Sequence, residues 1–150
     1  PFVHVGPDSR NWVNSLYGMT EKPIDDLVVL ARSWTQAPDL KVVSGNIKNL
    51  GYDMSQRSYK LENISSEVPQ ELEFLLCADE ISPLMNACLY IKGWGDAGVE
   101  LTVDGQNLVP GKDMELGYVR TITDSDLVVW ITKTSNRPVR ISLKPTAIPN

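Results

Sequence analysis

The sequence predicts an all-β fold, an antiparallel and jelly-roll-like sandwich of eight or nine short strands. First, apolar and polar residues alternate with a period of two over several short runs, as they do in half-buried strands. Second, glycine, proline, asparagine and aspartate recur between these runs and mark turns. Third, no long stretch repeats its apolar residues convincingly at the spacing of a helix. These features favour two packed sheets over a helical fold.

The predicted strands follow one another from residue 41 onward. Residues 71–77 are the clearest case, because Leu72, Phe74 and Leu76 share one face. The dipeptide Asp104-Gly105 follows residues 99–103 and is the strongest hairpin signal in the chain. The other predicted strands are residues 41–44, 57–61, 86–92, 114–119, 126–133 and 139–143.

Residues 1–26 predict an irregular lead-in, and residues 27–150 the sandwich domain. The lead-in carries Trp12, Tyr17 and Met19, which must pack either on this domain or on a missing neighbour. Because the chain begins at Pro1 without a leader, we expect a processed product or, preferably, a module excised from a larger protein.

Residues 25–34 are ambiguous. Two aspartates near the start suit the positive end of a helix. The β-branched centre and the stop at Ala37-Pro38 favour a strand, which we predict here.

Composition narrows the classes of function. The chain is 42% hydrophobic and 22% charged, and its net charge is −5. Nucleic acid is not expected as a partner, because binding phosphates needs a clustered basic face and the lysines and arginines are scattered. No apolar run approaches the ~20 residues of a membrane span, so we expect no membrane partner. We also expect the domain to be a monomer.

The two cysteines lie at either end of a predicted strand–loop–strand. Cys77 and Cys88 would face each other if the two strands were adjacent. We favour the alternative of two buried free thiols, because cysteine is among the most buried residue types.

Candidate catalytic residues are sparse. His4 is the one histidine and falls in the lead-in, and no cysteine or histidine cluster has zinc spacing. Asp79 with Glu80, or Asp124 with Asp126, offer carboxylate pairs for sugar chemistry, although turn residues are the favoured interpretation. We therefore expect a non-catalytic domain without a cofactor; calcium held by loop carboxylates is a weaker alternative.

Aromatic residues beside loops are the stronger signal. Trp94 lies between two glycines where a strand ends, a setting that leaves one ring face open to a ligand or lets the ring plug the core. Plugging the core is the favoured interpretation, and Trp94 is the first stacking candidate if its ring is open. Trp34 and Tyr52 also lie at element ends, whereas Trp130 is mid-strand and is expected in the core. Polar residues that could bind sugar hydroxyls, sulfate or uronate near these rings are Arg32, Arg57, Asn86, Lys92 and Asp96.

Four short motifs carry a resemblance to a known class of protein. They are Ala31-Arg32-Ser33-Trp34 with Ala37-Pro38, Gly51-Tyr52-Asp53 with Gln56-Arg57-Ser58-Tyr59, Ser82-Pro83-Leu84-Met85-Asn86, and Lys92-Gly93-Trp94-Gly95. This pattern resembles the β-sandwich modules attached to bacterial polysaccharide-degrading enzymes. The resemblance implies a secreted, cell-surface or periplasmic setting and a covalently linked catalytic domain. It also implies a polysaccharide ligand, and algal and acidic glycans are among the candidates.

Two functions from different classes remain. The first is a carbohydrate-binding module that targets an attached enzyme to its polysaccharide through the aromatic and polar residues named above. The second is an interaction domain that braces the catalytic domain of a larger enzyme. An enzyme that uses a carboxylate pair is a third, weaker alternative.

Overall fold

The computed structural model describes residues 21–67 and 69–147 and shows the predicted all-β sandwich, together with one helix that was not predicted. The elements in chain order are α2 (Ile24–Thr35), β1 (Asp39–Ser44), β2 (Ile47–Asp53), β3 (Ser58–Asn63), β4 (Leu72–Cys77), β5 (Leu84–Lys92), β6 (Gly98–Val103), β7 (Gln106–Asn107), β8 (Met114–Arg120), β9 (Ser125–Ser135) and β10 (Val139–Thr146). Among these residues, no helix is long and apolar enough to span a bilayer.

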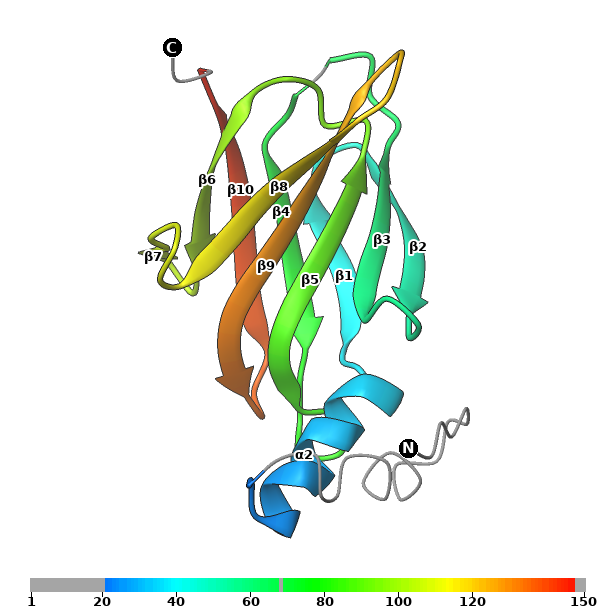
Figure 1. Ribbon diagram of the computed structural model, residues 1–150. Helices are drawn as coiled ribbons and strands as arrows, with labels where there is room; N and C mark the ends of the chain where they lie inside the picture. The colour runs from blue at the N-terminus through cyan, green and yellow to red at the C-terminus, as the bar shows by residue number, and fades with distance from the viewer. Residues whose placement is uncertain (1–20, 68, 148–150) are drawn as a thin grey trace.

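The strands form two five-stranded sheets that pack face to face (Figure 1). The first sheet has the order β1-β4-β10-β6-β7, and the second sheet has the order β2-β3-β5-β9-β8. All the pairs are antiparallel except β3 and β5, which run parallel, so the second sheet is mixed. The described chain has ten strands where eight or nine were predicted, because β2 and the two-residue β7 were not expected.

Alternation along the strands builds the core between the sheets. In β4, Leu72, Phe74 and Leu76 are buried, and the residues between them are half-buried. In β9, Leu127, Val129 and Ile131 face inward in the same way. One continuous apolar cluster therefore joins the inner faces of both sheets.

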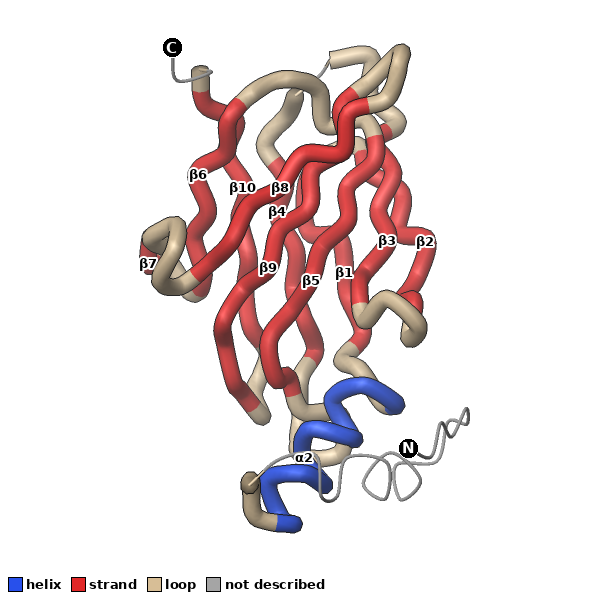
Figure 2. Tube along the Cα trace, in the orientation of Figure 1, coloured by secondary structure: helices blue, strands red, loops and turns tan. Residues whose placement is uncertain are grey.

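The segment predicted as a strand at residues 25–34 is a helix, which corrects that prediction. Helix α2 lies across one end of the sandwich, where Figure 2 draws it in blue below the strands. Leu27 and Ala31, one turn apart, are buried on the same face. The acidic first turn complements the helix dipole, and these two features outweigh the β-branched centre. The helix ends before Pro38, whose ring disfavours helical backbone at the preceding residue.

Candidate functional site

A wide hollow lies on the outer face of the second sheet. We call it the β3–β5 groove; its volume is about 790 Å³. The β2–β3 turn forms one wall, and the outward side chains of β3 and β5 form the floor. The lining residues are Leu50, Gly51, Tyr52, Asp53, Met54, Ser55, Gln56, Lys60, Leu61, Tyr90 and Lys92.

The register of the sheet brings the floor residues together. Lys60 on β3 lies directly opposite Tyr90 on β5, and Tyr90 lies opposite Val128 on β9. The Lys60 ammonium lies 4.2 Å from the centroid of the Tyr90 ring, close enough for a cation–π contact. The same ammonium also donates a hydrogen bond to the Gln56 side chain in the groove wall. Lys60 therefore links the floor of the groove to its wall.

A buried carboxylate fixes the Tyr90 side chain. The Tyr90 hydroxyl donates a hydrogen bond of 2.7 Å to Oδ2 of Asp126, which is only 8% exposed. Oδ1 of Asp126 accepts the backbone N–H of Gly93 at 3.0 Å. The hydrogen bond from its hydroxyl to Asp126 raises the pKa of Tyr90, because the shared proton is held between the two oxygens. Asp126 thus holds the phenol and the turn after β5 in a fixed relation.

The groove wall is held by an Asx turn at its base. Oδ1 of Asp53 accepts hydrogen bonds from the Ser55 backbone N–H at 2.9 Å, the Ser55 hydroxyl at 2.6 Å and the Gln56 backbone N–H at 3.2 Å. The Ser55 hydroxyl is the main cause that lowers the pKa of the Asp53 carboxyl. This carboxylate is therefore engaged in folding the turn.

Tyr52 and Trp34, two of the predicted stacking residues, are both half-buried. The ring of Tyr52 contacts the ring of the buried Tyr59, with 5.0 Å between centroids, and burial raises the pKa of Tyr52 to about 12. The guanidinium of Arg57 lies 3.5 Å from the centroid of the Trp34 ring. Tyr52 lines the β3–β5 groove, whereas Trp34 and Arg57 do not. Trp34 and Arg57 instead join the helix to the β2–β3 turn.

Trp94 does not present an uncovered ring, so the stacking role predicted for it is wrong, and its favoured placement in the core is confirmed. Its side chain is 1% exposed and belongs to the central core. Gly93, with a φ of +69°, turns the chain at the end of β5, and the indole points into the core. The indole N–H donates to the Ala97 carbonyl oxygen at 3.1 Å, which satisfies its polar edge. Trp94 therefore plugs the core, the other of the two placements that its glycine neighbours permit.

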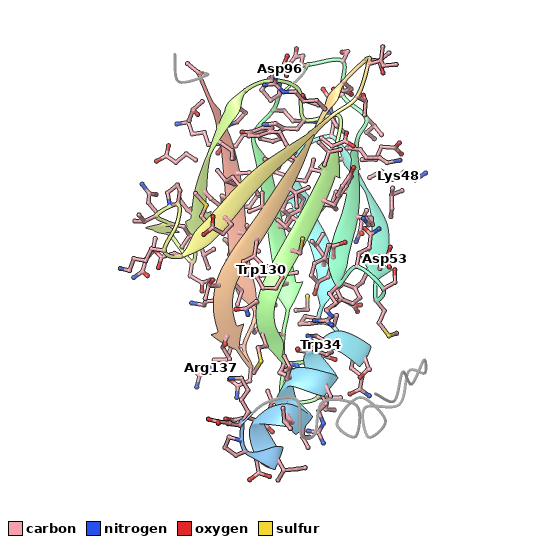
Figure 3. The ribbon with its side chains drawn as sticks, in the orientation of Figure 1. Trp34, Lys48, Asp53, Asp96, Trp130 and Arg137 are labelled. Carbon is pink, nitrogen blue, oxygen red and sulfur yellow. The ribbon has the colours of Figure 1, made fainter. Side chains whose placement is uncertain are left out.

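The prediction that Trp130 lies in the core is also wrong. Its side chain is 40% exposed on the outer face of β9, where Figure 3 labels it. Strand β9 turns Leu127, Val129 and Ile131 inward, so the residues between them must face outward. Trp130 lies opposite Cys88 on β5, on the same face as Tyr90.

The remaining predicted polar residues are spread over the molecule. Lys92 lines the β3–β5 groove. Asp96 lies near the end of the sandwich opposite the helix, where it accepts a hydrogen bond from the Ser125 hydroxyl at 2.9 Å (Figure 3). Arg32 lies on the helix, and Asn86 has a φ of +61° at a bulge in β5. The structure therefore places Lys92, but not Arg32, Asn86 or Asp96, in the groove.

The cysteines and the other candidate groups offer no further chemistry. Cys77 and Cys88 are free and half-buried, and they lie in different sheets, so they do not face each other across adjacent strands. Burial raises the pKa of the Cys88 thiol. Oδ1 of Asp79 accepts two backbone N–H groups of its own turn. Within residues 21–67 and 69–147, no three His, Cys, Asp or Glu residues gather as a metal site would need. The lead-in residues His4, Trp12, Tyr17 and Met19 lie outside the described residues.

Three residues on the outer face of the second sheet were not predicted as site residues, namely Lys60, Tyr90 and Trp130. The alternation of inward and outward residues along each strand could have identified them. Once Leu89 and Ile91 are placed inward, Tyr90 and Lys92 must face outward. Trp94 was named as a stacking candidate instead, because it lies between two glycines at the end of a strand. The outward rows of a central strand are therefore a better guide to this face than its turn residues.

Comparisons with protein-family models, with curated proteins and with solved structures find no match for this chain. The interpretation of the site consequently depends on its own geometry.

Proposed function

We propose that this domain is a non-catalytic carbohydrate-binding module and that the β3–β5 groove is its glycan site. The observation that carries the proposal is the fixed Tyr90 ring on the floor of a wide hollow, between two lysines and beside a polar turn. The resemblance in sequence to accessory modules points to the same class. In this proposal the domain holds a covalently linked catalytic domain against a polysaccharide outside the cytoplasm.

The chemistry of the groove suits a sugar. A pyranose ring has an apolar C–H surface that packs on an aromatic face, and hydroxyl groups at its rim that need donors and acceptors. Tyr90 supplies aromatic surface, and Trp130 adds a ring on the next strand, whereas the ring of Tyr52, which also lines the groove, packs on the buried Tyr59. Lys60, Lys92 and the polar turn supply hydrogen-bonding groups at the rim. The Asp126 carboxylate fixes the phenol before any ligand arrives, which reduces the entropy lost on binding.

The test is isothermal calorimetry, with affinity electrophoresis, on a panel of neutral, uronate and sulfated glycans. Tyr90→Ala should weaken binding about two- to tenfold, because a stacked ring contributes about 0.5–1.5 kcal/mol beyond its buried area. Tyr90→Phe is the matched control, because it keeps the ring and loses only the hydrogen bond to Asp126, so most of the affinity should remain. If no glycan binds, or if both variants bind as tightly as the parent protein, the groove is not a glycan site.

A second candidate function is bracing of an attached catalytic domain, and the end of the sandwich that carries α2 favours it. Ile24, at the start of the helix, is 51% exposed, and Ile81, in the β4–β5 loop, is 69% exposed. Large apolar groups at one end of a domain suit a permanent neighbour. Replacing both isoleucines with serine should loosen such a neighbour from the domain without changing glycan binding. Limited proteolysis of the larger protein measures this loosening.

A further inference from the structure

Two lysines lie beside Tyr90 in the β3–β5 groove. Lys60 is directly opposite Tyr90 on the neighbouring strand. Lys92 is two residues beyond Tyr90 on β5, so both side chains leave the same face of the sheet. The Lys60 ammonium lies over the Tyr90 ring, so a sugar that packs on Tyr90 must displace Lys60 or use the other ring face, and Lys92 would then lie beside the sugar.

The carboxylates nearest to the groove already accept hydrogen bonds from the protein. Asp53 accepts those of its own turn, and Asp126 accepts the Tyr90 hydroxyl and the backbone N–H of Gly93. Both oxygens of Asp126 are consequently engaged and are poor competitors for Lys92. Oδ2 of Asp53 accepts none of these hydrogen bonds, and besides the hydrogen bonds of its turn the charge of Lys60 is among the causes that lower the pKa of the Asp53 carboxyl, so this carboxylate partly balances Lys60.

The two ammonium groups lack an ion-pair partner among residues 21–67 and 69–147. The ion pairs in that part of the chain join Lys133 to Asp104 and Arg140 to Glu73, all away from the groove. Glu62 lies opposite Lys92 on β3, yet the two make no ion pair. Each ammonium carries three donors, and Lys60 uses one of them on Gln56. Lys92 therefore offers the groove a charged donor that is available to a ligand, whereas Lys60 is partly balanced by Asp53.

From this arrangement we infer that the glycan bound in the β3–β5 groove is anionic, with a carboxylate or a sulfate group that meets Lys92 while the sugar ring packs on Tyr90. This inference rests on the proposed function and gives it a ligand class. An acidic substituent accepts charge-assisted hydrogen bonds, which are stronger than those from neutral hydroxyls. A neutral glycan would leave the Lys92 charge partly desolvated without compensation.

The test compares ligands that differ only in charge. Polygalacturonate is set against its fully methyl-esterified form, and a sulfated galactan against its desulfated form, in calorimetric titrations of the full chain. The first pair reports a carboxylate ligand and the second pair a sulfate ligand. The variant Lys92→Met removes the proposed contact, and Lys144→Met is its control, because Lys144 is an equally exposed strand residue on the first sheet. Both variants change the net charge by the same amount, so long-range repulsion of a polyanion is matched.

We expect one of the two charged polymers to bind and its neutral form to bind at least tenfold more weakly. Lys92→Met should weaken binding of the charged form about tenfold, which corresponds to about 1.4 kcal/mol, and Lys144→Met should leave it unchanged. If charged and neutral forms bind equally, or if the two variants behave alike, the inference is wrong although the domain still binds glycans. If no polymer of either kind binds, the proposed function fails as well.

Discussion

Replacing either Trp94 or Trp130 with alanine removes the same side chain from two opposite environments. Trp94 is 1% exposed, and its indole N–H is bonded to a backbone carbonyl, whereas Trp130 is 40% exposed on the outer face of β9. Truncation of a buried tryptophan costs about 3–5 kcal/mol, because its packing is lost and a cavity remains. Truncation of a residue at the surface costs about 1 kcal/mol or less. We therefore expect Trp94→Ala to be severely destabilised and Trp130→Ala to be nearly as stable as the parent protein.

Urea denaturation followed by far-UV circular dichroism measures both free energies of unfolding. In a domain of this size, 1 kcal/mol shifts the melting temperature by about 2–4 °C, so Trp94→Ala should melt about 6–20 °C lower. Trp130→Ala should lose glycan affinity instead of stability. If Trp130→Ala is destabilised as strongly as Trp94→Ala, the assignment of β9 residues to the inner and outer faces is refuted.

Three further predictions follow from contacts beside the groove. Asp126→Asn keeps one acceptor oxygen but leaves either the Tyr90 hydroxyl or a turn N–H unpaired, so urea denaturation should show a loss of about 1–3 kcal/mol; an unchanged stability would contradict the fixed phenol. Arg57 has a φ of +51° and its guanidinium lies over Trp34. Both Arg57→Ala and Arg57→Gly lose the cation–π contact, but only glycine adopts this backbone angle without strain. Urea denaturation should therefore show Arg57→Gly to be more stable than Arg57→Ala by about 1 kcal/mol. Burial raises the pKa of Tyr52 to about 12 from about 10 in the unfolded chain. The stability that the protonated phenol contributes is therefore complete below about pH 10 and is lost as the pH rises toward about 12. Tyr52→Phe should unfold at a higher pH than the parent protein, and an unchanged alkaline midpoint would argue against this burial.

Strand alternation was enough to predict the sandwich. Leu72, Phe74 and Leu76 in β4 alternate with more polar neighbours, and burial of one sheet face explains that period directly. The helix α2 was missed because a short apolar run with β-branched residues suits either element. Its burial at Leu27 and Ala31 depends on where the segment packs, which a local pattern does not contain.

The candidate site was predicted only in part. Tyr52 and Lys92 do line the groove, but Trp94 is buried and cannot stack on a ligand, and Trp130, which was expected in the core, is exposed. The direction of Trp94 depends on the backbone angles of the glycines around it, and that of Trp130 depends on the phase of β9 against the core. Both are tertiary properties, because they are decided by what the opposite sheet covers. Asp126 was considered as half of a catalytic pair, and its role as the partner of Tyr90 required the pairing of β5 with β9.

The most direct test of the account is to map a bound glycan by amide chemical-shift changes. The ¹⁵N-labelled protein is titrated with the tightest-binding oligosaccharide of the panel. We expect the largest shifts at Lys60, Tyr90, Lys92 and in the β2–β3 turn, with small shifts on the first sheet. Shifts that cluster on α2 and the β4–β5 loop, or none at saturating ligand, would contradict a glycan site on the outer face of the second sheet.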